Sequence, residues 1–578
     1  MEARKLFTMS EQGKSEYCCN VVRIGEVIPI EGSDFLGKTL VNGESIIIRK
    51  DQVQEGSLMF YASHECQLNA DFLGVNNLYE ISEYERNSNA EELRATVNEA
   101  NELSASAKAE LKLAASIKKA VAKVKKSIQD NGVTPCNTAR KMLLRECEVT
   151  ENPDSIDNES LVTLADAAIA LHESNAESYR AKCEELRSEA KRHVGFFNKY
   201  GRVKMLRLRG VPSMGFLFTI NEMAKYCPEV TEVNLEDLLE HDFDTVNGEL
   251  FVKAYVPPVK PVHSGGGKGQ QGDRAAKRFD RMIAGEFLFH YDTDPLPKNM
   301  HKIQPDDVVT VTVKLHGTSV IVANVRTKTP LPWYKLLPIK VWNGLTNLIG
   351  LSKWNVQDYK IEYGNVYSSR KVIKNQTINP QAANGHYYST DVWGEANEAL
   401  EPYIGEGMTV YGEIVGFGRD GKPIQGIWDY GCASTQMKVY PYRITTTTED
   451  GKKKEWNVSD VINWTIDLLK EHPNLKEKVG VLPLVWHGTL QELYPDIPVE
   501  NHWHENVLER LKVEKKFGME EHEEMCRNEA APREGVCLRI DDDPFVECFK
   551  LKTVAFRIAE GKLIDNGEVD EEMAENFS

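Results

Sequence analysis

Two long runs of apolar residues, spaced three and four apart, set the strongest limit on how this chain can fold. The first run extends from Leu93 to Ile128 and the second from Leu161 to Leu186. Apolar residues at these spacings line one face of an α-helix. Each run is much longer than an average globular helix. We therefore expect two long amphipathic helices that pack antiparallel as a coiled-coil-like hairpin.

Short strand patterns flank this helical region on both sides. Residues 17–82 contain short alternating runs, and Asn42-Gly43 is a two-residue β-hairpin signal. Residues 200–220 again show the short alternating pattern that is typical of strands. The pattern predicts a small β-barrel or sandwich into which the helical hairpin is inserted.

A stretch rich in proline and glycine separates this part from the rest of the chain. Residues 256–278, which contain SGGGKGQQG, are expected to be an interdomain linker. From 279 to 556 the alternating strand patterns predict one large α+β domain, with a helical interruption at 331–351. Residues 557–578 are acidic and are expected to form a frayed tail.

The net charge of −18 is unusual for a protein that binds nucleic acid, but a binding footprint is a local property. Arg207 and Arg209 lie in a stretch without acidic residues and fit a phosphate-binding site as well as an exposed strand face. A lysine-rich part of the first helix is either an RNA-binding face or, more commonly, a solvated helix face. Its lysines are Lys112, Lys118, Lys119, Lys123, Lys125 and Lys126.

Features of a membrane or secreted protein are missing from the sequence. No apolar run is long enough to span a membrane, and the first residues lack the apolar core of a signal peptide. The 11 cysteines are scattered without paired CxxC spacing. We therefore expect a cytoplasmic protein with reduced thiols and no membrane partner.

The segment from Gly32 to Thr39 matches the phosphate-binding pattern G-x-x-x-x-G-K-[ST]. Such a loop must follow a strand and open a helix, because the amides at the helix N-terminus hold the phosphates. The residues from Leu40 to Lys50 instead indicate a turn between strands. A surface turn is therefore the expected structure, and a P-loop ATPase is a weak alternative.

The segment VVTVTVKLHGTSVIV, residues 308–322, alternates between β-branched and polar residues. Lys314 and His316 therefore share the polar face of one strand, and Gly317 allows a tight turn beside them. A lysine–x–x–glycine pattern is common by chance. Its weight depends on the elements that accompany it.

Four such elements follow in order along the chain. Arg370 is a candidate phosphate or ribose anchor, and Glu413 lies in VYGEIVGFG, a strand pattern that ends in glycines. Glu534 stands at the start of a predicted strand. Lys550 and Lys552 are two residues apart, so their side chains point to the same side of a strand.

The ordered set resembles the motifs of the covalent nucleotidyltransferases, the superfamily of DNA ligases, RNA ligases and mRNA capping enzymes. Lys314 to Gly317 is similar to motif I, Glu413 to motif III, Glu534 to motif IV, and Lys550 with Lys552 to motif V. Arg370 resembles motif Ia, and Tyr442 in MKVYPYRIT resembles the aromatic residue of motif IIIa. The form KLHGT, with His316 where DNA ligases carry aspartate, resembles the RNA-ligase-2-like branch.

The segments VIPIEGSDF and KMLRLRG are similar to RNA ligases that carry an N-terminal OB module. The resemblance implies an OB-type β-barrel in two parts, 1–83 and 195–255, interrupted by the helical hairpin at 84–194. There Arg207 and Arg209 would contact nucleic acid or pyrophosphate. It also implies that 279–556 is an ATP-grasp-like nucleotidyltransferase domain of antiparallel sheets with helices.

The resemblance further implies an ATP-dependent RNA ligase. Lys314 would attack the α-phosphorus of ATP to give lysyl-AMP, and the AMP would pass to an RNA 5′-phosphate before the RNA 3′-hydroxyl displaces it. Lys550 and Lys552 would contact the α-phosphate, and Glu413 and Glu534 would hold Mg²⁺ or Mn²⁺. The implied partner is RNA at duplex nicks or broken ends, including RNA–DNA hybrids.

Other residues receive roles from the same resemblance. Gly317 and Arg370 would contact the nucleotide, Tyr442 would stack on adenine, and His316 would serve the steps after the first. Because a protonated lysine is a poor nucleophile, we expect burial or a neighbouring cation to favour the neutral form of Lys314.

Two alternatives stay open. A DNA ligase or capping enzyme typically carries an OB domain after motif V, whereas only 26 residues follow Lys552. A catalytically inactive or differently specific RNA-binding relative could use the helical hairpin as an interface for a protein partner. The presence of both glutamates and both motif V lysines disfavours this second alternative.

Overall fold

The structure is a computed structural model in which contacts divide the chain into two units. Unit 1 comprises residues 1–23, 58–203 and 215–254, and unit 2 comprises residues 24–57, 204–214 and 255–578. The residues described are 3–11, 13, 17–51, 53–129, 137–147, 156–239, 241–256, 279–290, 293–337, 358–378, 388, 390–448, 451–500, 502–517, 522–541 and 548–565. Nearly all of the linker predicted at 256–278, and most of the helical interruption predicted at 331–351, lie outside these residues.

Unit 1 combines short strands with two very long helices. Its elements are α1 (Ala3–Leu6), β1 (Phe7–Thr8), β2 (Cys19–Arg23), β6 (Leu58–Ala62), β7 (Cys66–Leu68), α2 (Ala70–Val75), α3 (Ala90–Gln129), α4 (Asn137–Glu146), α5 (Asn158–Lys191), β10 (Phe216–Phe218), α6 (Ile220–Tyr226), β11 (Thr245–Val246), β12 (Glu249–Leu250) and β13 (Val252–Ala254).

The strands of unit 1 enclose an aromatic core. Phe60 stacks on Phe218 with ring centroids 5.3 Å apart, and Phe243 contacts Phe7 at 4.7 Å. The sheets are β10-β6-β2, β1-β11-β12 and β13-β7. Within the described part of unit 1 these sheets have at most three strands and close no barrel. The predicted OB-type barrel is therefore not confirmed, and residues 24–57 and 204–214, expected to belong to it, group with unit 2 instead.

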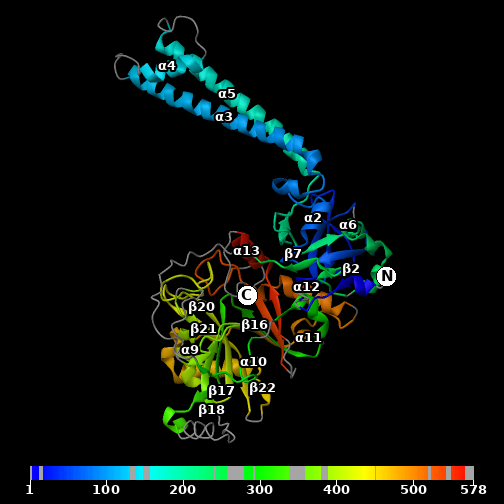
Figure 1. Cartoon of the computed structure of the whole chain (residues 1–578), viewed down its shortest axis with the longest axis vertical. Coiled ribbons are helices and arrows are strands. Elements are labelled where there is room, and N and C mark those ends of the chain that lie inside the picture. Colours follow the sequence, from blue (N-terminus) through cyan, green and yellow to red (C-terminus); the bar gives the residue numbers. More distant parts are fainter. Residues whose placement is uncertain are drawn as a thin grey trace, which may run out of the picture. The chain divides into compact units, whose positions relative to one another are not determined.

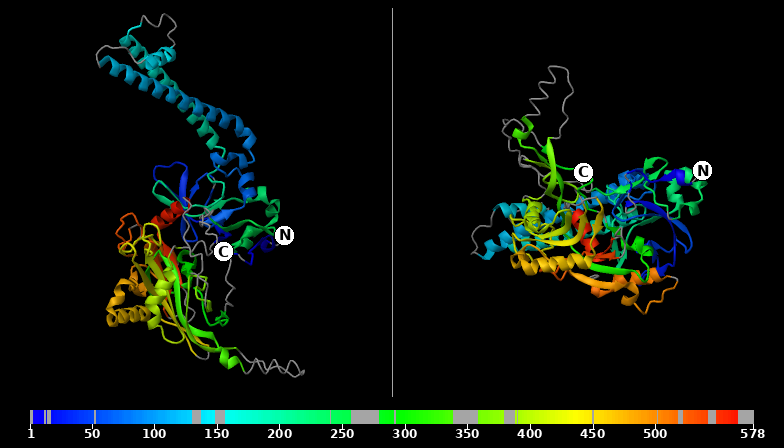
Figure 2. Two further views of the ribbon diagram at one scale, coloured as in Figure 1. Left: turned by 60° about the vertical axis from the view of Figure 1, so that its left-hand side comes forward. Right: turned by 90° about the horizontal axis from the view of Figure 1, so that it is seen from below.

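The helices α3 and α5 lie side by side along their length, as Figure 1 and the left view of Figure 2 show. They are antiparallel, because residues late in α3 pair with residues early in α5. The ion pairs are Lys125–Asp166 at 3.4 Å, Lys118–Glu173 at 2.5 Å and Glu99–Lys182 at 3.0 Å. The short helix α4 was not predicted; its Leu143 is fully buried against both long helices.

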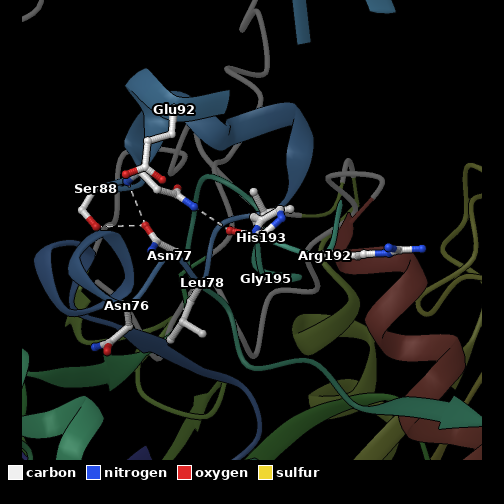
Figure 3. A pocket seen from close by; sticks show the side chains of 10 residues that line it. Asn76, Asn77, Leu78, Ser88, Glu92, Arg192, His193 and Gly195 are labelled. Carbon is white, nitrogen blue, oxygen red and sulfur yellow. Dashed lines mark hydrogen bonds between the residues drawn. The ribbon is translucent and has the colours of Figure 1, made fainter. Parts of the chain in front are cut away.

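The two long helices join the rest of unit 1 through a set of polar side chains. Asn77 Oδ1 accepts hydrogen bonds from Ser88 Oγ at 3.0 Å and from the Asn89 amide at 3.1 Å. Asn89 Nδ2 in turn donates to the carbonyl of His193 at 2.8 Å, just after α5 ends. These groups line a cavity of about 590 Å³ (Figure 3). They fix the entry and the exit of the hairpin against the same loop.

Unit 2 contains most of the strands that the structure describes. Its elements are β3 (Ile28–Pro29), β4 (Leu36–Val41), β5 (Glu44–Arg49), β8 (Leu206–Leu208), β9 (Val211–Ser213), β14 (Phe279–Asp280), β15 (Asp294–Pro295), α7 (Leu296–Asn299), β16 (Val308–Lys314), β17 (Thr318–Pro330), β18 (Tyr359–Ser368), β19 (Thr377–Ile378), α9 (Val392–Leu400), β20 (Met408–Gly416), β21 (Met437–Thr447), β22 (Lys453–Glu455), α10 (Val458–Glu471), β23 (Leu484–Thr489), α11 (Leu490–Leu493), α12 (Trp503–Val513), β24 (Gly535–Ile540), β25 (Cys548–Lys552) and α13 (Val554–Asp565).

Two five-stranded sheets, both largely antiparallel, form the body of unit 2. Their orders are β15-β25-β24-β16-β23 and β18-β17-β20-β21-β22. Val309 and Val311 of β16 enter a hydrophobic core with α12, as the alternation predicts. The polar side of β16 is also buried, because Arg539 of β24 reaches Glu455 of the other sheet at 2.8 Å. The polar side of β16, which Thr310 shares with its ladder partner Arg539, therefore faces the second sheet.

A third sheet, β3-β4-β5, also belongs to unit 2. Asn42 and Gly43 form its tight turn with φ of 50° and 71°, which confirms the hairpin signal. Lys38 and Thr39 lie on β4, opposite Ile47 and Ile46. No helix follows them, so the arrangement excludes a P-loop at this position.

The chain after β25 does not begin its acidic tail where the sequence predicted. Residues 554–565 form α13, in which Phe556 is fully buried and Arg557 contacts Glu44 of β5 at 3.4 Å. The tail predicted at 557–578 therefore starts inside a helix, and its residues from 566 onward lie outside the described part. No helix among the described residues has the length and apolar character needed to cross a membrane.

Candidate active site

An ion pair between Lys314 and Glu534 lies at the centre of the candidate site. Lys314 is the last residue of β16, and Glu534 directly precedes β24, opposite it in the antiparallel ladder. Lys314 Nζ donates to Glu534 Oε1 at 2.7 Å. The Lys314 side chain is 21% exposed and that of Glu534 only 2%, so the carboxylate is buried while the amine has access to solvent. Strand pairing thus joins two residues that are 220 positions apart.

Lys552 reaches the same carboxylate from the next strand. Its Nζ lies 3.4 Å from Glu534 Oε1 and 3.2 Å from Glu560 Oε1 of α13. The position follows from register, because Gly535 pairs with both Lys314 and Lys552. The structure thus brings Lys552 together with Lys314 and Glu534, and its contact with the α-phosphate stays a prediction.

Glu413 approaches from the second sheet. It lies on β20, where Glu413 Oε1 accepts a hydrogen bond from the amide of Gly317 at 2.9 Å. An added Cβ at Gly317 would lie only 2.2 Å from the Ile414 carbonyl oxygen, so only glycine fits here. Gln425 Nε2 donates to the Gly317 carbonyl at 2.8 Å. The turn after Lys314 is thus held on both of its backbone groups.

His316 lies two residues beyond the end of β16, so the prediction that it shares one strand with Lys314 is wrong. Its side chain is enclosed by aromatic rings. Its ring lies 4.6 Å from that of Trp428 and 4.8 Å from that of Phe556, both edge-to-face. Its amide donates to the hydroxyl of Tyr430 at 2.6 Å. The Nδ1 atom of His316 is 3.9 Å from Glu534 Oε2. Trp428 and Phe556 were not among the predicted residues, because no local pattern marks the partner of a ring distant in sequence.

The charges of the central pair differ from the sequence expectation. Burial by itself lowers the pKa of Lys314, but the attraction of Glu534, with smaller effects of Cys537 and Glu413, raises it above its ordinary value. Burial likewise raises the pKa of Glu534, and Lys314 and Lys552 outweigh that effect and lower it. The residues around Lys314 therefore contradict the expectation that burial or a neighbouring cation keeps its amine neutral. The nearest charge is a carboxylate, so the amine is protonated.

Glu413 behaves in the opposite way. Burial raises the pKa of Glu413 to about 8, against the opposing effects of Lys314, the Gly317 amide and Arg370. Glu413 therefore carries its proton over much of the neutral range, in contrast to Glu534. The two carboxyl groups of the site are thus held in different protonation states by their surroundings.

The two carboxyl groups suit a hard divalent cation. Oxygen ligands are those that Mg²⁺ and Mn²⁺ prefer, and such ions in phosphate chemistry commonly use one or two carboxylates plus phosphate oxygens and water. Within the described residues Glu534 Oε2 is a buried acceptor without a hydrogen-bond donor. The described residues contain no group of three or more acidic, histidine or cysteine ligands. The two carboxyl groups therefore fit a cation whose remaining ligands come from the substrate phosphates and from water.

Several other predicted residues lie near this centre. Arg370 is close enough to Glu413 to lower its pKa, and Glu413 is close enough to Tyr442 to raise the pKa of the Tyr442 hydroxyl. The Tyr442 hydroxyl lies 3.2 Å from His290 Nδ1, a contact that the sequence did not indicate. Lys550 lies opposite Cys537 in the ladder, two residue pairs from the Gly535–Lys552 pair that adjoins Glu534.

Arg207 and Arg209 are placed differently. Arg207 is on β8 and Arg209 is in the turn that follows, where it has φ of 51° and donates to the carbonyl of Gly32 at 2.5 Å. Both are exposed. The described contacts of Arg209 thus connect two surface loops of unit 2 and do not join it to the Lys314 centre.

Comparisons with known proteins give weak similarities only. No protein-family model matches the chain, and no curated protein matches it. Among solved structures, a mutant of the Naegleria gruberi RNA ligase with AMP and Mn is 13% identical, with 94% of this chain and 98% of that chain covered and a TM-score of 0.44. Another mutant with ATP and Mn is 14% identical with the same coverage and a TM-score of 0.43. At such values a likeness establishes neither a shared fold nor a shared function.

Proposed function

We propose that the chain is an ATP-dependent RNA ligase that joins a 5′-phosphate to an RNA 3′-hydroxyl through a lysyl-AMP intermediate on Lys314. The observation that carries the proposal is the contact of Lys314 with Glu534, beside Lys552 and Glu413. A nucleophile, a second cation and two carboxyl groups thus meet at the ends of paired strands. The order KLHGT, Glu413, Glu534 and Lys552 along the chain supports the same chemistry.

The first step requires a neutral Lys314. Its Nζ attacks the α-phosphorus of ATP, the N–P bond forms as the bond to the β-phosphate oxygen breaks, and pyrophosphate leaves. Glu534 Oε1, which already accepts a hydrogen bond from Lys314 Nζ, is placed to receive the proton. Lys552 carries a positive charge 3.4 Å from that oxygen and would attract the phosphate oxygens of the nucleotide.

A divalent cation held by Glu534 and Glu413 would neutralise both carboxylates, lower the pKa of Lys314 and stabilise the charge on the phosphate oxygens. Glu413 must lose its proton to take part, since its pKa is about 8. Gly317 and Arg370 would contact the nucleotide, with Tyr442 against the adenine. Lys550 would assist at the α-phosphate.

In the later steps an RNA 5′-phosphate oxygen attacks the AMP phosphorus, the N–P bond breaks, and Lys314 regains a proton. The 3′-hydroxyl then attacks the 5′-phosphorus, a phosphodiester bond forms, and AMP leaves. The Nδ1 atom of His316 lies 3.9 Å from Glu534, and its ring is fixed by Trp428 and Phe556. We assign His316 to the orientation of groups in these steps.

The test is covalent labelling by ATP that carries the label on the α-phosphate, with Mg²⁺ or Mn²⁺ present. Wild-type protein should retain acid-labile label after denaturation and release it with pyrophosphate, whereas Lys314→Ala should retain none. Lys38→Ala is the matched control, because Lys38 belongs to the rejected P-loop pattern on β4 and should label normally. Absence of label with ATP, GTP or NAD in folded wild-type protein would leave an inactive RNA-binding relative.

Nicked duplexes distinguish an RNA ligase from a DNA ligase. The proposal predicts sealing when the 3′-hydroxyl end is RNA, in an RNA duplex or an RNA–DNA hybrid, and much slower sealing when that end is DNA. Equal or faster sealing of an all-DNA nick would favour the DNA ligase alternative.

A further inference from the structure

Five lysines form a continuous stripe along the exposed side of α3. They are Lys108, Lys112, Lys119, Lys123 and Lys126, and each is exposed. With about 100° between successive residues they fall within a sector of about 60°, and they extend over about 27 Å of the helix axis. The buried residues Ile117 and Val121 lie on the other side of the helix, against α4 and α5. The lysine stripe therefore faces away from the packed side of the hairpin.

The charge of this part of the chain is opposite to that of the whole. Residues 103–129 contain seven lysines and one glutamate, a net charge of +6, whereas the whole chain carries −18. The single acid, Glu110, is turned toward α5, where it contacts His172 at 2.6 Å. The local excess of positive charge on α3 is therefore not balanced by acids of the same helix.

The seven lysines divide into two groups with different partners. Lys118 and Lys125 form ion pairs with Glu173 and Asp166 of α5. The five lysines of the stripe take part in no ion pair with any residue that the structure describes. The first group thus contributes to packing of the hairpin, and the stripe is left for an external anion.

The side chains that lie among the lysines limit which kind of partner the stripe can bind. The exposed Ala105 lies within the same sector, and the exposed Ala115 and Ala122 lie within about 40° of it. No large apolar side chain of α3 is exposed among the described residues. A helix that binds a membrane surface needs a large apolar face. A protein interface is usually centred on buried aromatic or arginine anchors. A row of phosphates needs only positive charge at regular intervals.

We propose that the lysine stripe of α3 binds the sugar–phosphate backbone of the RNA substrate. The choice of RNA rests on the proposed function. One strand of nucleic acid carries a phosphate about every 3.4 Å, so 27 Å spans about eight phosphates, enough for all five lysines. Such contacts release counterions and read no sequence. The stripe would therefore add affinity for RNA that falls steeply with salt.

The test measures binding of a fluorescent nicked RNA duplex to the full-length chain between about 50 and 200 mM KCl. Lys112→Gln/Lys119→Gln removes two charges from the stripe, and Lys118→Gln/Lys125→Gln removes two from the paired group. The stripe variant should lower the slope of log Kd against log salt by about 1.4 to 1.8 and raise Kd roughly tenfold or more at about 100 mM. The paired-group variant should change Kd less than twofold. Equal effects of both variants, or none, would overturn the proposal.

Two further measurements separate this inference from the ligase proposal. Lysyl-AMP formation needs no RNA, so the stripe variant should take up label from ATP like the wild type. If the wild type takes up none, but the stripe variant still binds RNA more weakly than the paired-group variant, the ligase proposal fails and the stripe stands. Vesicles of phosphatidylserine and phosphatidylcholine provide the last comparison: loss of vesicle binding with unchanged RNA binding would assign the stripe to a lipid surface.

Discussion

Replacing Glu534 by glutamine tests whether this one carboxylate keeps Lys314 protonated. The Lys314 Nζ to Glu534 Oε1 distance is 2.7 Å. At that distance the attraction of two unit charges is about 1.5 kcal/mol in a water-like medium and about 6 kcal/mol at an effective dielectric constant of 20. Each 1.4 kcal/mol changes a protonation equilibrium about tenfold. Glu534→Gln should therefore raise the fraction of neutral Lys314 at pH 8 by at least about tenfold.

Brief acetylation of the metal-free protein at pH 8 measures this fraction, since only the neutral amine reacts. Mass spectrometry of the Lys314 peptide, normalised to that of exposed Lys108 in the same digest, should show the increase. Glu560→Gln is the matched control, because Glu560 contacts Lys552 at 3.2 Å and has no described contact with Lys314. An unchanged Lys314 rate in Glu534→Gln, or an equal increase in Glu560→Gln, would refute the electrostatic account.

Two other substitutions test the turn and the second carboxyl group. Gly317→Ala places a Cβ 2.2 Å from the Ile414 carbonyl oxygen, so it should lower the free energy of unfolding by about 1–3 kcal/mol and abolish labelling by ATP. Gly405→Ala, with no atom within 4 Å of its Cβ, is the control in the same urea titration and should leave stability nearly unchanged. Burial raises the pKa of Glu413 to about 8, above its unfolded value, so the stability from its protonated form is present below the unfolded pKa and is lost as pH rises through about 8. Glu413→Gln should therefore gain stability relative to wild type between pH 5 and 9, by about 1.4 kcal/mol per pH unit at most, in urea titrations without metal; a constant difference would contradict that pKa.

Local sequence patterns were sufficient to predict those elements whose conformation depends only on their own residues. The three-and-four spacing predicted the long helices, and Asn42-Gly43 predicted the turn between β4 and β5. Alternation predicted that Lys314 lies on a strand, which is confirmed, although the strand ends there and does not reach His316. Glu534 was expected at the start of a strand, and β24 begins one residue after it. In each case the deciding factor is the period of the backbone or the φ that a residue tolerates, and both are local.

The domain limits were less accessible to the same reasoning. Residues 24–57 have the strand texture of their neighbours, yet they group with unit 2. One reason is the buried contact of Glu44 with Lys512, at 2.9 Å, and with Arg557. The local sequence pattern around Glu44 or around Lys512 cannot predict this contact, because the two residues are more than 460 positions apart.

By itself, then, the sequence predicted which side chains could do chemistry, and it placed Lys314 and Glu413 on strands. Only the tertiary structure decided how they are charged. Lys314 was expected to be neutral, but strand pairing brings Glu534 to 2.7 Å and holds the proton on the amine. Glu413, an identical carboxyl group, has its pKa raised to about 8 because burial outweighs its partners. Coulomb interactions and desolvation depend on distances between atoms, and those distances exist only once the two sheets have packed.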